Sequence, residues 1–389
     1  MWQKIKNVYH LCQAIVATLL YNSPAKSMTV IGVTGTDGKT TTASLLYHIL
    51  RGSGKSAAII STVSAIINGK EFDTGFHVST PGPFDLQKYI KQAKDAGVSY
   101  LILEVTSHAI DQHRIYGIPF AIAVLTNVTH EHMDYHKTYE HYAKTKLSLL
   151  QMAKVAIVNR DDESYTLLSD TKKWKSYGLG ENANVNPKVF PFKTELVGEF
   201  NRYNILAAIS VAKELGLPDE AIRKAIADFK PPVGRMDTVY DKDFRVMVDF
   251  AHTPNALEQL LKTVREGKKE GERIIHVFGS AGGRDRTKRP KMGAVSAKYS
   301  DLIFLTAEDP RNELLDEILD QIEDGMKEKV VSVERIADRQ EAITKAISVA
   351  KKGDTVIITG KGHEQSMNMG QGEEPWSDYE AVAKALKLR

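Results

Sequence analysis

The chain has 389 residues, of which 42% are hydrophobic and 26% are charged, so it has the composition of a globular protein and can form two or three domains. Lys and Arg (52) exceed Asp and Glu (49) by three, a net charge too small to indicate a nucleic-acid partner. A single cysteine, Cys12, excludes an internal disulfide and fits a reducing compartment, which predicts a cytoplasmic protein.

The first 27 residues form a distinct segment. Lys4 and Lys6 precede an apolar run from Leu11 to Tyr21, which is too short to span a bilayer and contains Gln13. We expect a helix that packs against the body of the protein or lies at a membrane surface, and base rates favour packing.

Residues 30–42 read VIGVTGTDGKTTT, a strand that leads through a glycine loop into a helix. In such a loop Gly35 and Gly38 turn backbone N–H groups toward an anion, Lys39 places a charge on the outer phosphates, and the Thr40 hydroxyl can ligate Mg²⁺. The spacing departs from the strict pattern, because Val33 stands where an additional glycine is expected. The segment predicts a nucleotide site rather than a purely structural turn.

Alternating strands and helices follow, which predicts a mostly parallel sheet with crossover helices. Predicted helices of this first part cover residues 39–52, 83–96, 201–215 and 218–229, and predicted strands cover residues 56–61, 100–105, 120–126 and 155–159. The break at residues 231–234, Pro-Pro-Val-Gly, is the best domain boundary in the sequence.

Two groups of metal-type residues follow strands of this first part. Glu104 ends a strand, where open α/β sheets present ligands, and can hold the same Mg²⁺ as Thr40 or act only as a salt-bridge partner. The run His130–His136 follows the next strand. Since it has no cysteine ligands and no helical His-Glu-x-x-His spacing, one imidazole in a Mg²⁺ shell is favoured over zinc.

After the break the pattern restarts as a second doubly wound unit. It has predicted strands at residues 246–250, 274–278, 302–306, 330–333 and 355–359, with helices at 254–265 and from about 289. Its GSAGG turn at residues 279–283 is not by itself specific for NAD. The predicted fold class is therefore α/β: a P-loop-type central ATPase domain (28–232) with a mostly parallel sheet, then a Rossmann-like doubly wound C-terminal domain (233–389).

Ten motifs in order resemble those of the Mur ligases, and within them the UDP-N-acetylmuramyl-tripeptide synthetase (MurE) type. They read TGTDGKTTT, EVTSHAIDQHR, TNVTHEHMDYH, EHYAKTK, GEFNRYN, GRMD, DFAHTPNALE, VFGSAGGRDRTKRP, EDPRNE and GKGHE. The resemblance implies an ATP-dependent amide ligase of peptidoglycan synthesis. A peptide carboxylate attacks the γ-phosphate to give an acyl phosphate, and an incoming amine then displaces phosphate.

The resemblance also implies two Mg²⁺ ions and a carbamate. Thr40 and Glu104 would hold the first ion and His132 would help to hold the second. Lys146 matches a lysine that CO₂ converts to a carbamate, an anion that can support a metal where an ammonium cannot. Lys144, half a helical turn away, is a competing candidate, and a solvated lysine face is the alternative that composition favours.

Nucleotide roles carry over to further positions. Asn201 and Asn204 match residues that face adenine, although Asn204 can equally be a helix-start cap. Arg235 matches an arginine that reaches the phosphates, and Asp249 and His252 match residues near ribose and phosphate. The predicted ATP site comprises Gly35, Thr36, Asp37, Gly38, Lys39, Thr40, Thr41, Asn201, Asn204, Arg235, Asp249 and His252.

Substrate contacts are implied in both halves. Those matched to the muramyl-peptide acceptor are Ser79, Thr80, Thr106, Ser107, Gln112 and Arg114, and those matched to the incoming amino acid are Asp309, Arg311, Gly360 and Glu364. Arg311 favours meso-diaminopimelate over lysine, which has no second carboxylate for a guanidinium to bind. Asp309 stands where diaminopimelate enzymes of the family have asparagine.

In the family, an N-terminal domain of about one hundred residues holds the uridine diphosphate, and here only 27 residues precede the predicted ATPase domain. Either UDP binds weakly, or another protein supplies that surface, or the acceptor is a different one. We expect a monomer. Two alternatives to the MurE-type reaction stay open: a related ligase such as a folylpolyglutamate, poly-γ-glutamate or cyanophycin synthetase, and a nucleotide-binding subunit without catalysis.

Overall fold

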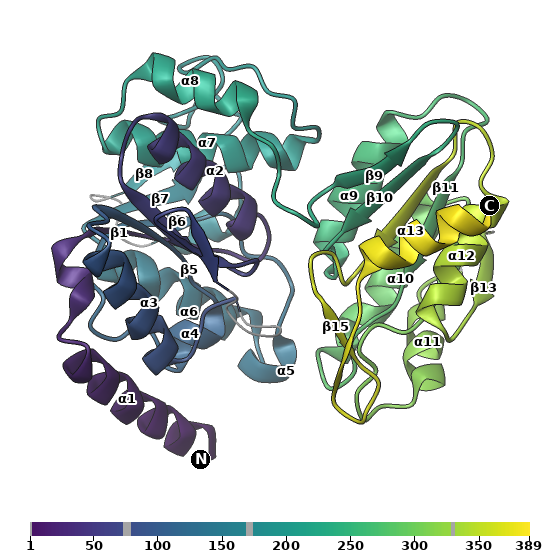
Figure 1. Cartoon of the computed structure of the whole chain (residues 1–389), viewed down its shortest axis with the longest axis horizontal. Helices are drawn as coiled ribbons and strands as arrows, with labels where there is room; N and C mark the ends of the chain where they lie inside the picture. The colour runs from purple at the N-terminus through teal and green to yellow at the C-terminus, as the bar shows by residue number, and fades with distance from the viewer. Residues whose placement is uncertain (1, 73–78, 169–173, 328–330) are drawn as a thin grey trace. The chain divides into compact units, whose positions relative to one another are not determined.

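A computed structural model describes residues 2–72, 79–168, 174–327 and 331–389 (Figure 1). The chain divides into two compact units. The first comprises Met1–Thr129 and Thr138–Pro231, and the second comprises His130–Lys137 and Pro232–Arg389. No helix among the described ranges is long and apolar enough to cross a membrane.

An eight-stranded sheet forms the centre of the first unit. Six of its strands pair in parallel, and two short strands at one edge form an antiparallel extension that the periodicity did not reveal. In sheet order the strands are β4 (Lys70–Phe72), β3 (Ala65–Ile67), β2 (Ala57–Ile60), β5 (Tyr100–Glu104), β1 (Thr29–Thr34), β6 (Phe120–Leu125), β7 (Val155–Asn159) and β8 (Trp174–Tyr177).

Helices cover both faces of this sheet (Figure 1). One face carries α2 (Lys39–Gly52), α7 (Glu199–Glu214) and α8 (Asp219–Asp228). The other carries α3 (Pro83–Asp95), α4 (Ser107–Asp111) and α6 (Tyr139–Met152), and α1 (Trp2–Leu20) and the short turn η1 (Pro24–Ser27) pack beside α3.

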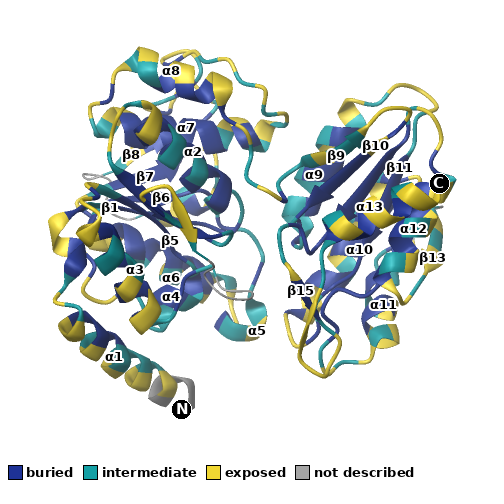
Figure 2. Cartoon of the chain, in the orientation of Figure 1, coloured by how far each residue is buried: buried dark blue, intermediate teal, exposed yellow. Residues whose placement is uncertain are grey.

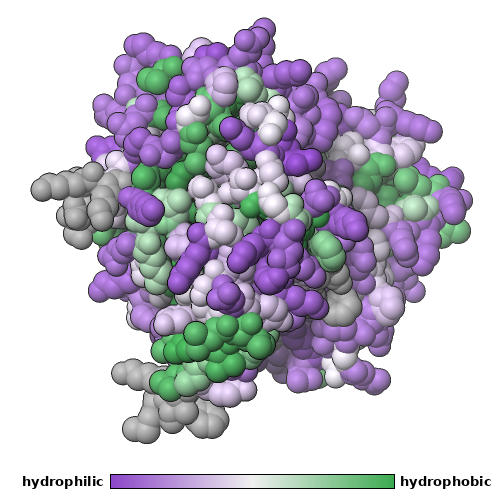
Figure 3. All heavy atoms as spheres, turned by 60° about the vertical axis from the view of Figure 1, so that its left-hand side comes forward, coloured by the Kyte–Doolittle hydropathy of each residue, from purple (hydrophilic) through white to green (hydrophobic). Residues whose placement is uncertain are grey.

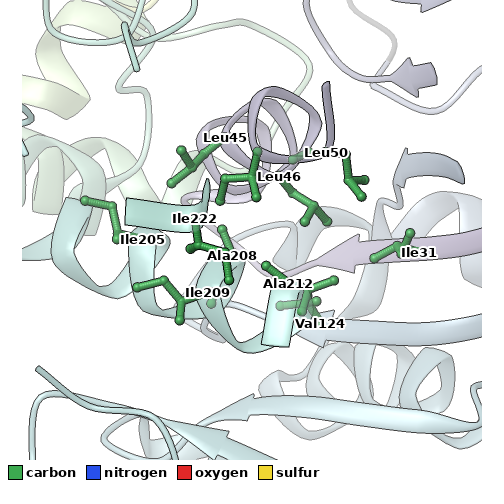
Figure 4. Close-up of a cluster of buried hydrophobic side chains, with 14 of the residues drawn as sticks. Ile31, Leu45, Leu46, Leu50, Val124, Ile205, Ala208, Ile209, Ala212 and Ile222 are labelled. Carbon is green, nitrogen blue, oxygen red and sulfur yellow. The ribbon is translucent and has the colours of Figure 1, made fainter. Parts of the chain in front are cut away.

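The interior between α2, α7 and the sheet is buried (Figure 2) and is filled by hydrophobic side chains (Figure 4). Leu45 and Leu46 of α2 and Ile205 and Ile209 of α7 belong to this core, and all four side chains are fully buried. Their spacing of one and four residues places them on one stripe of each helix, which explains why the helices pack there. This packing fixes α2 against the sheet, directly after the loop that follows β1.

The second unit has a six-stranded sheet whose strands pair in parallel except for β9 at one edge. Alternate side chains of the strand at residues 274–278 enter different cores. Ile274 and Phe278 face the helices at residues 254–266, 289–299 and 315–323, whereas Ile275 and Val277 face the helices at residues 339–349 and 378–388. Its strands in sheet order are β13 (Ser332–Arg335), β12 (Leu302–Leu305), β11 (Ile274–Phe278), β14 (Thr355–Thr359), β10 (Arg245–Asp249) and β9 (Asp237–Asp241).

The remaining elements of the second unit are α5 (Met133–His136), α9 (Pro254–Glu266), η3 (Arg286–Lys288), α10 (Arg289–Tyr299), α11 (Leu315–Glu323), α12 (Arg339–Val349), the hairpin β15 (Ser366–Asn368) and β16 (Glu373–Pro375), and α13 (Asp378–Leu388). The first unit also has η2 (Glu163–Leu167). The predicted α/β class is confirmed in both units. The strand predicted at 330–333 begins at Ser332, and residue 330 lies outside the described residues.

Candidate active site

The predicted phosphate loop joins the end of β1 to the first residue of α2. Gly38 precedes α2 with φ 81°, and Gly35 has φ 148°, both in the region that favours glycine. A Cβ atom at Gly35 would lie 1.7 Å from Thr126 Oγ1, and one at Gly38 would lie 2.2 Å from Asn204 Oδ1. The glycines are therefore required by close packing as well as by conformation, and the loop presents the N-terminus of a 14-residue helix to an anion.

Glu104 lies at the end of β5, 1% exposed, and accepts hydrogen bonds from two threonines. The Thr40 hydroxyl donates to Oε2 (2.9 Å), the Thr62 hydroxyl donates to Oε1 (2.8 Å), and the Thr62 backbone N–H donates to Oε2 (3.0 Å). The structure gives Glu104 no cationic partner among the described residues, so the salt-bridge alternative is wrong. A carboxylate and a hydroxyl held together beside a phosphate loop are the hard oxygen ligands that Mg²⁺ takes.

Lys146 on α6 lies against the same loop. Its side chain is buried, its Nζ donates to Gly35 O at 2.6 Å, and it lies over the Tyr142 ring at 4.6 Å. Lys144 on the same helix is exposed. The expectation of a solvated lysine face is wrong for Lys146, and between the two candidates only Lys146 is directed at the loop.

Asn127 lies just after β6 and forms hydrogen bonds with the phosphate loop, a role that the sequence did not reveal. Its Oδ1 accepts from the Asp37 N–H (2.9 Å), its Nδ2 donates to Asp37 O (3.2 Å), and its carbonyl accepts from the Thr36 N–H (2.9 Å). The Thr36 side chain in turn lies 3.0 Å from the Tyr142 hydroxyl. The sequence feature that could have identified Asn127 is its position at the end of a strand, in the motif TNVTHEHMDYH.

The predicted adenine residues lie on α7. The helix begins at Glu199, so Asn204 lies inside it and the cap alternative is wrong. Asn204 Oδ1 accepts from the Thr42 hydroxyl (3.4 Å), and Asn204 Nδ2 donates to Asn201 Oδ1 (3.2 Å). Both asparagines are thus connected to α2, the helix that carries Thr41 in its first turn.

Four of the predicted acceptor residues form one hydrogen-bonded group beside Glu104. The Thr80 hydroxyl donates to Glu104 O (2.9 Å) and accepts from the Thr106 N–H (3.1 Å). Arg114 donates to Thr80 O (2.8 Å) and, from Nε and Nη2, to Gln112 Oε1 (2.9 and 2.6 Å). Ser107 is buried at the start of α4 and Ser79 is partly exposed.

The predicted nucleotide residues of the second unit surround Phe250. The Arg235 guanidinium lies 4.6 Å from the centre of the Phe250 ring, and His252 Nδ1 donates to Phe250 O (2.8 Å). Asp249 accepts from the Met236 and Ala251 N–H groups, both at 2.6 Å. Asp249 therefore orders the chain around Phe250.

The predicted amino-acid residues gather around Lys361. Its Nζ lies 2.9 and 3.0 Å from the two carboxylate oxygens of Asp309 and 2.7 Å from Glu364 Oε2. Asp309 Oδ1 also accepts from the Asn368 N–H (2.9 Å), and the Asn368 carbonyl accepts from the Arg311 N–H (3.1 Å). The loop after β12 and the loop after β14 are joined by these contacts.

Comparison with known proteins identifies the family. The Mur ligase middle domain matches residues 33–212, and the Mur ligase glutamate ligase domain matches residues 234–362. A UDP-N-acetylmuramoyl-L-alanyl-D-glutamate–2,6-diaminopimelate ligase of Caldanaerobacter subterraneus is 37% identical over 96% of this chain and 81% of its own length. The chain belongs to the Mur ligase family. Mur ligases are ATP-dependent acid–amino-acid ligases, and this enzyme is one of the MurE-like members.

Solved structures agree with this assignment. A diaminopimelate ligase of the same description superposes with a TM-score of 0.60 at 29% identity, covering 93% of this chain and 78% of that one. Mycobacterium tuberculosis folylpolyglutamate synthase superposes with a TM-score of 0.70 at 18% identity, covering 90% and 91% of the two chains. The second likeness is one of fold alone.

His132 is part of the segment of this Mur ligase that belongs to the second unit. The segment is held there by an ion pair of Glu131 with Lys288 (3.1 Å) and by a hydrogen bond from the Met133 N–H to Asp285 (3.2 Å). No cluster of three or more His, Cys, Asp or Glu able to hold a metal occurs within the described ranges. The role of His132 as a ligand of a second Mg²⁺ stays a prediction.

Arg284 of the Mur ligase was missed by the sequence analysis. It follows the GSAGG turn, and its pKa is lowered by partial burial and by the nearby Arg311 guanidinium. The structure gives it no hydrogen-bond or ion-pair partner among the described side chains, whereas Arg311 donates to Gly282 O (2.9 Å). A glycine at 282 is needed because its Cβ would lie 1.9 Å from Pro310 O, which gives this turn a structural purpose other than NAD binding.

Glu308 lies beneath Gly360, another predicted amino-acid contact. A Cβ at Gly360 would lie 2.0 Å from Glu308 Oε2, and this buried oxygen has no hydrogen-bond partner among the described residues. Burial raises the pKa of Glu308 to about 7, against the opposing charges of Arg339, Lys288 and Lys361, while Asp309 raises it further.

This raised pKa predicts a pH-dependent stability. Folding favours protonated Glu308, so its contribution is fully present below the ordinary pKa near 4.5 and is lost as pH rises through about 7. Since one pKa unit corresponds to ~1.4 kcal/mol, the free energy of unfolding should decrease by about 3 kcal/mol over this pH range. Urea unfolding from pH 4.5 to 8 should show this loss in the wild type and not in Glu308→Gln, and parallel profiles would contradict it.

Proposed function

We propose that this Mur ligase joins meso-diaminopimelate to the glutamyl carboxylate of UDP-N-acetylmuramoyl-L-alanyl-D-glutamate in peptidoglycan precursor synthesis. The observation that carries the proposal is the pair of neighbouring guanidinium groups of Arg284 and Arg311, of which Arg311 donates to Gly282 O (2.9 Å) in the turn that precedes Arg284. The relative from Caldanaerobacter carries this activity in its name, which supports the same assignment. ATP is a cytoplasmic substrate, so we place the reaction in the cytoplasm.

Two adjacent guanidinium groups favour a ligand with a carboxylate at that point. The two guanidinium charges repel each other, although Asp134, Asp309 and Glu131 partly offset this repulsion at Arg284. A carboxylate ligand can accept two parallel hydrogen bonds from a guanidinium. Diaminopimelate has a second carboxylate distant from its reacting amine, and lysine has none. Asp309 would not contact the ligand as an asparagine can, because Lys361 neutralises its carboxylate.

We assign nucleotide binding mainly to residues 28–232 and amino-acid binding to residues 233–389. The α2 N-terminus and Lys39 bind the phosphates, and Asn201 and Asn204 face the base. The acceptor carboxylate, oriented by the group of Thr80, Thr106, Gln112 and Arg114, attacks the γ-phosphorus, and the bond to the β-phosphate oxygen breaks to release ADP. The amine then attacks the acyl carbon, phosphate leaves, and the amine loses a proton.

The residues present fit divalent ions. Thr40 and Glu104 supply a hydroxyl and a carboxylate in contact (2.9 Å), and His132 and a carbamate on Lys146 complete the proposed ligands of two Mg²⁺ ions. Bound Mg²⁺ would neutralise charge on the phosphates during transfer. The burial of Lys146 and its contact with Gly35 of the loop support the proposal of a carbamate at this position.

The test is phosphate release with ATP, Mg²⁺ and UDP-muramoyl dipeptide, adding diaminopimelate, lysine or no amino acid. We expect turnover with diaminopimelate. Turnover with lysine instead would contradict the amino-acid assignment, and turnover only with a folate or polyglutamate acceptor would contradict the acceptor. A parallel assay with a muramoyl dipeptide that lacks UDP measures how much the UDP group contributes to acceptor binding and turnover.

We expect Arg311→Ala to raise the KM for diaminopimelate by about 10- to 100-fold, because it removes a charge-assisted pair. The KM for ATP should stay near the wild-type value, because Arg311 does not belong to the proposed phosphate site. Steady-state kinetics with each substrate varied checks both. Arg245→Ala, at an exposed arginine of the same unit, is the control. Equal effects on both KM values would refute the role of Arg311.

A further inference from the structure

One face of α1 attaches the helix to the first unit. Ala14 and Ala17 are buried on this face, and the Thr18 hydroxyl donates to Tyr116 O (3.1 Å) and accepts from Gln87 Nε2 (3.3 Å). The Asn7 side chain donates to Asp111 at 2.9 Å. Small and polar residues therefore contribute to holding the helix in place, and Leu11 and Ile15 are partly buried beside them.

The opposite face of α1 is apolar and exposed. Its large side chains are Val8, Tyr9, Val16, Leu19 and Leu20, which are 62%, 61%, 53%, 73% and 68% exposed. At 100° per residue these positions and the exposed Cys12 cover an arc of about 120° with no polar residue inside it. Figure 3 shows the resulting contiguous hydrophobic patch near its lower edge. A soluble monomer rarely leaves such a patch uncovered without a use for it.

The charges of the helix have a single sign. Its sequence, WQKIKNVYHLCQAIVATLL, contains Lys4 and Lys6 and neither aspartate nor glutamate. A helix that carries lysines and no acidic residue is attracted to the headgroups of an anionic lipid surface. Two copies of this helix facing each other would place like charges together, which disfavours a second copy of the chain as the occupant.

We propose that α1 lies flat in an anionic lipid surface and holds the enzyme at the membrane as a peripheral protein. Val16 and Leu19 enter the acyl boundary, and the net positive charge of the helix favours anionic headgroups. The helix cannot serve as a transmembrane span, since no described helix meets the length and hydropathy that crossing requires. This inference stands independently of the substrate assigned above.

The test is co-flotation of the full chain with vesicles of phosphatidylcholine alone or with 30% phosphatidylglycerol. We expect binding to the anionic vesicles, weaker binding at high salt, and a loss of about tenfold or more in Val16→Glu/Leu19→Glu, because charges replace apolar groups in the boundary. Lys4→Glu/Lys6→Glu should lose the preference for anionic vesicles.

The matched control is Val189→Glu/Leu388→Glu, which charges two side chains of the same types that are 63% and 77% exposed outside α1. It should float as the wild type does, and all variants should keep wild-type thermal unfolding and ligase activity in solution. Absent vesicle binding, or equal binding by Val16→Glu/Leu19→Glu, would overturn the proposal. If the protein instead sediments as a dimer without lipid, and if Val16→Glu/Leu19→Glu dissociates that dimer, the apolar face of α1 binds a second copy of the chain and not a membrane.

Discussion

Replacing Lys39 with alanine should lower kcat by about 1,000-fold, because the transferring phosphoryl group then loses the loop's cationic side chain. Lys39 is only partly buried and donates to Thr36 O (2.8 Å), so its amine can turn to a phosphate at little structural cost. The described structure gives this lysine no ion pair whose loss would unfold the protein.

Phosphate release at saturating substrates measures this effect, and thermal unfolding verifies that the variant folds. Lys55→Ala, at an exposed lysine three residues beyond α2, is the matched control and should keep wild-type kcat. A kcat for Lys39→Ala close to that of the wild type would show that the loop does not hold the reacting phosphates.

For Lys146→Ala we expect kcat to fall by about 100-fold or more and formate or acetate to restore part of it, because a small carboxylate can take the place of the carbamate. A lysine with a merely structural role would not be rescued by a carboxylate. Activity of the wild type should also fall in buffer depleted of CO₂ and return with bicarbonate.

Lys144→Ala is the control for this variant, since Lys144 lies on the same helix and is exposed. It should retain wild-type kcat. A Lys146→Ala enzyme as active as the wild type would remove the carbamate from the mechanism. An impaired enzyme that neither carboxylate restores, with no dependence of the wild type on CO₂, would do the same.

Local sequence determined much of the fold. The strands at residues 155–159, 274–278 and 355–359 and the helix at residues 39–52 have the predicted bounds, because each is a continuous apolar run or an amphipathic repeat closed by a glycine or a polar turn. The hairpin of β3 and β4 was missed, since strands of three residues leave too short a pattern and are held by pairing with β2.

The candidate site likewise has parts that the sequence predicts and parts that only the structure reveals. The phosphate loop could be recognised from sequence, because its chemistry depends on glycines, a lysine and a threonine that are consecutive in the chain. The choice of Lys146 over Lys144 could not, because it depends on which side of α6 faces Gly35. The pairing of Asp309 with Lys361, 52 residues apart, likewise required two strand ends of a parallel sheet to meet.

The sequence by itself determined the phosphate loop, the alternation of strands and helices, and the acid-free amphipathic first helix, since all three are patterns between near neighbours. Only the tertiary structure decided that Glu104 is held by two threonines, that Arg284 lies by Arg311, that Glu308 is buried beneath Gly360, and which face of α1 remains exposed. Those properties depend on distances and burial between distant segments, which no local pattern encodes.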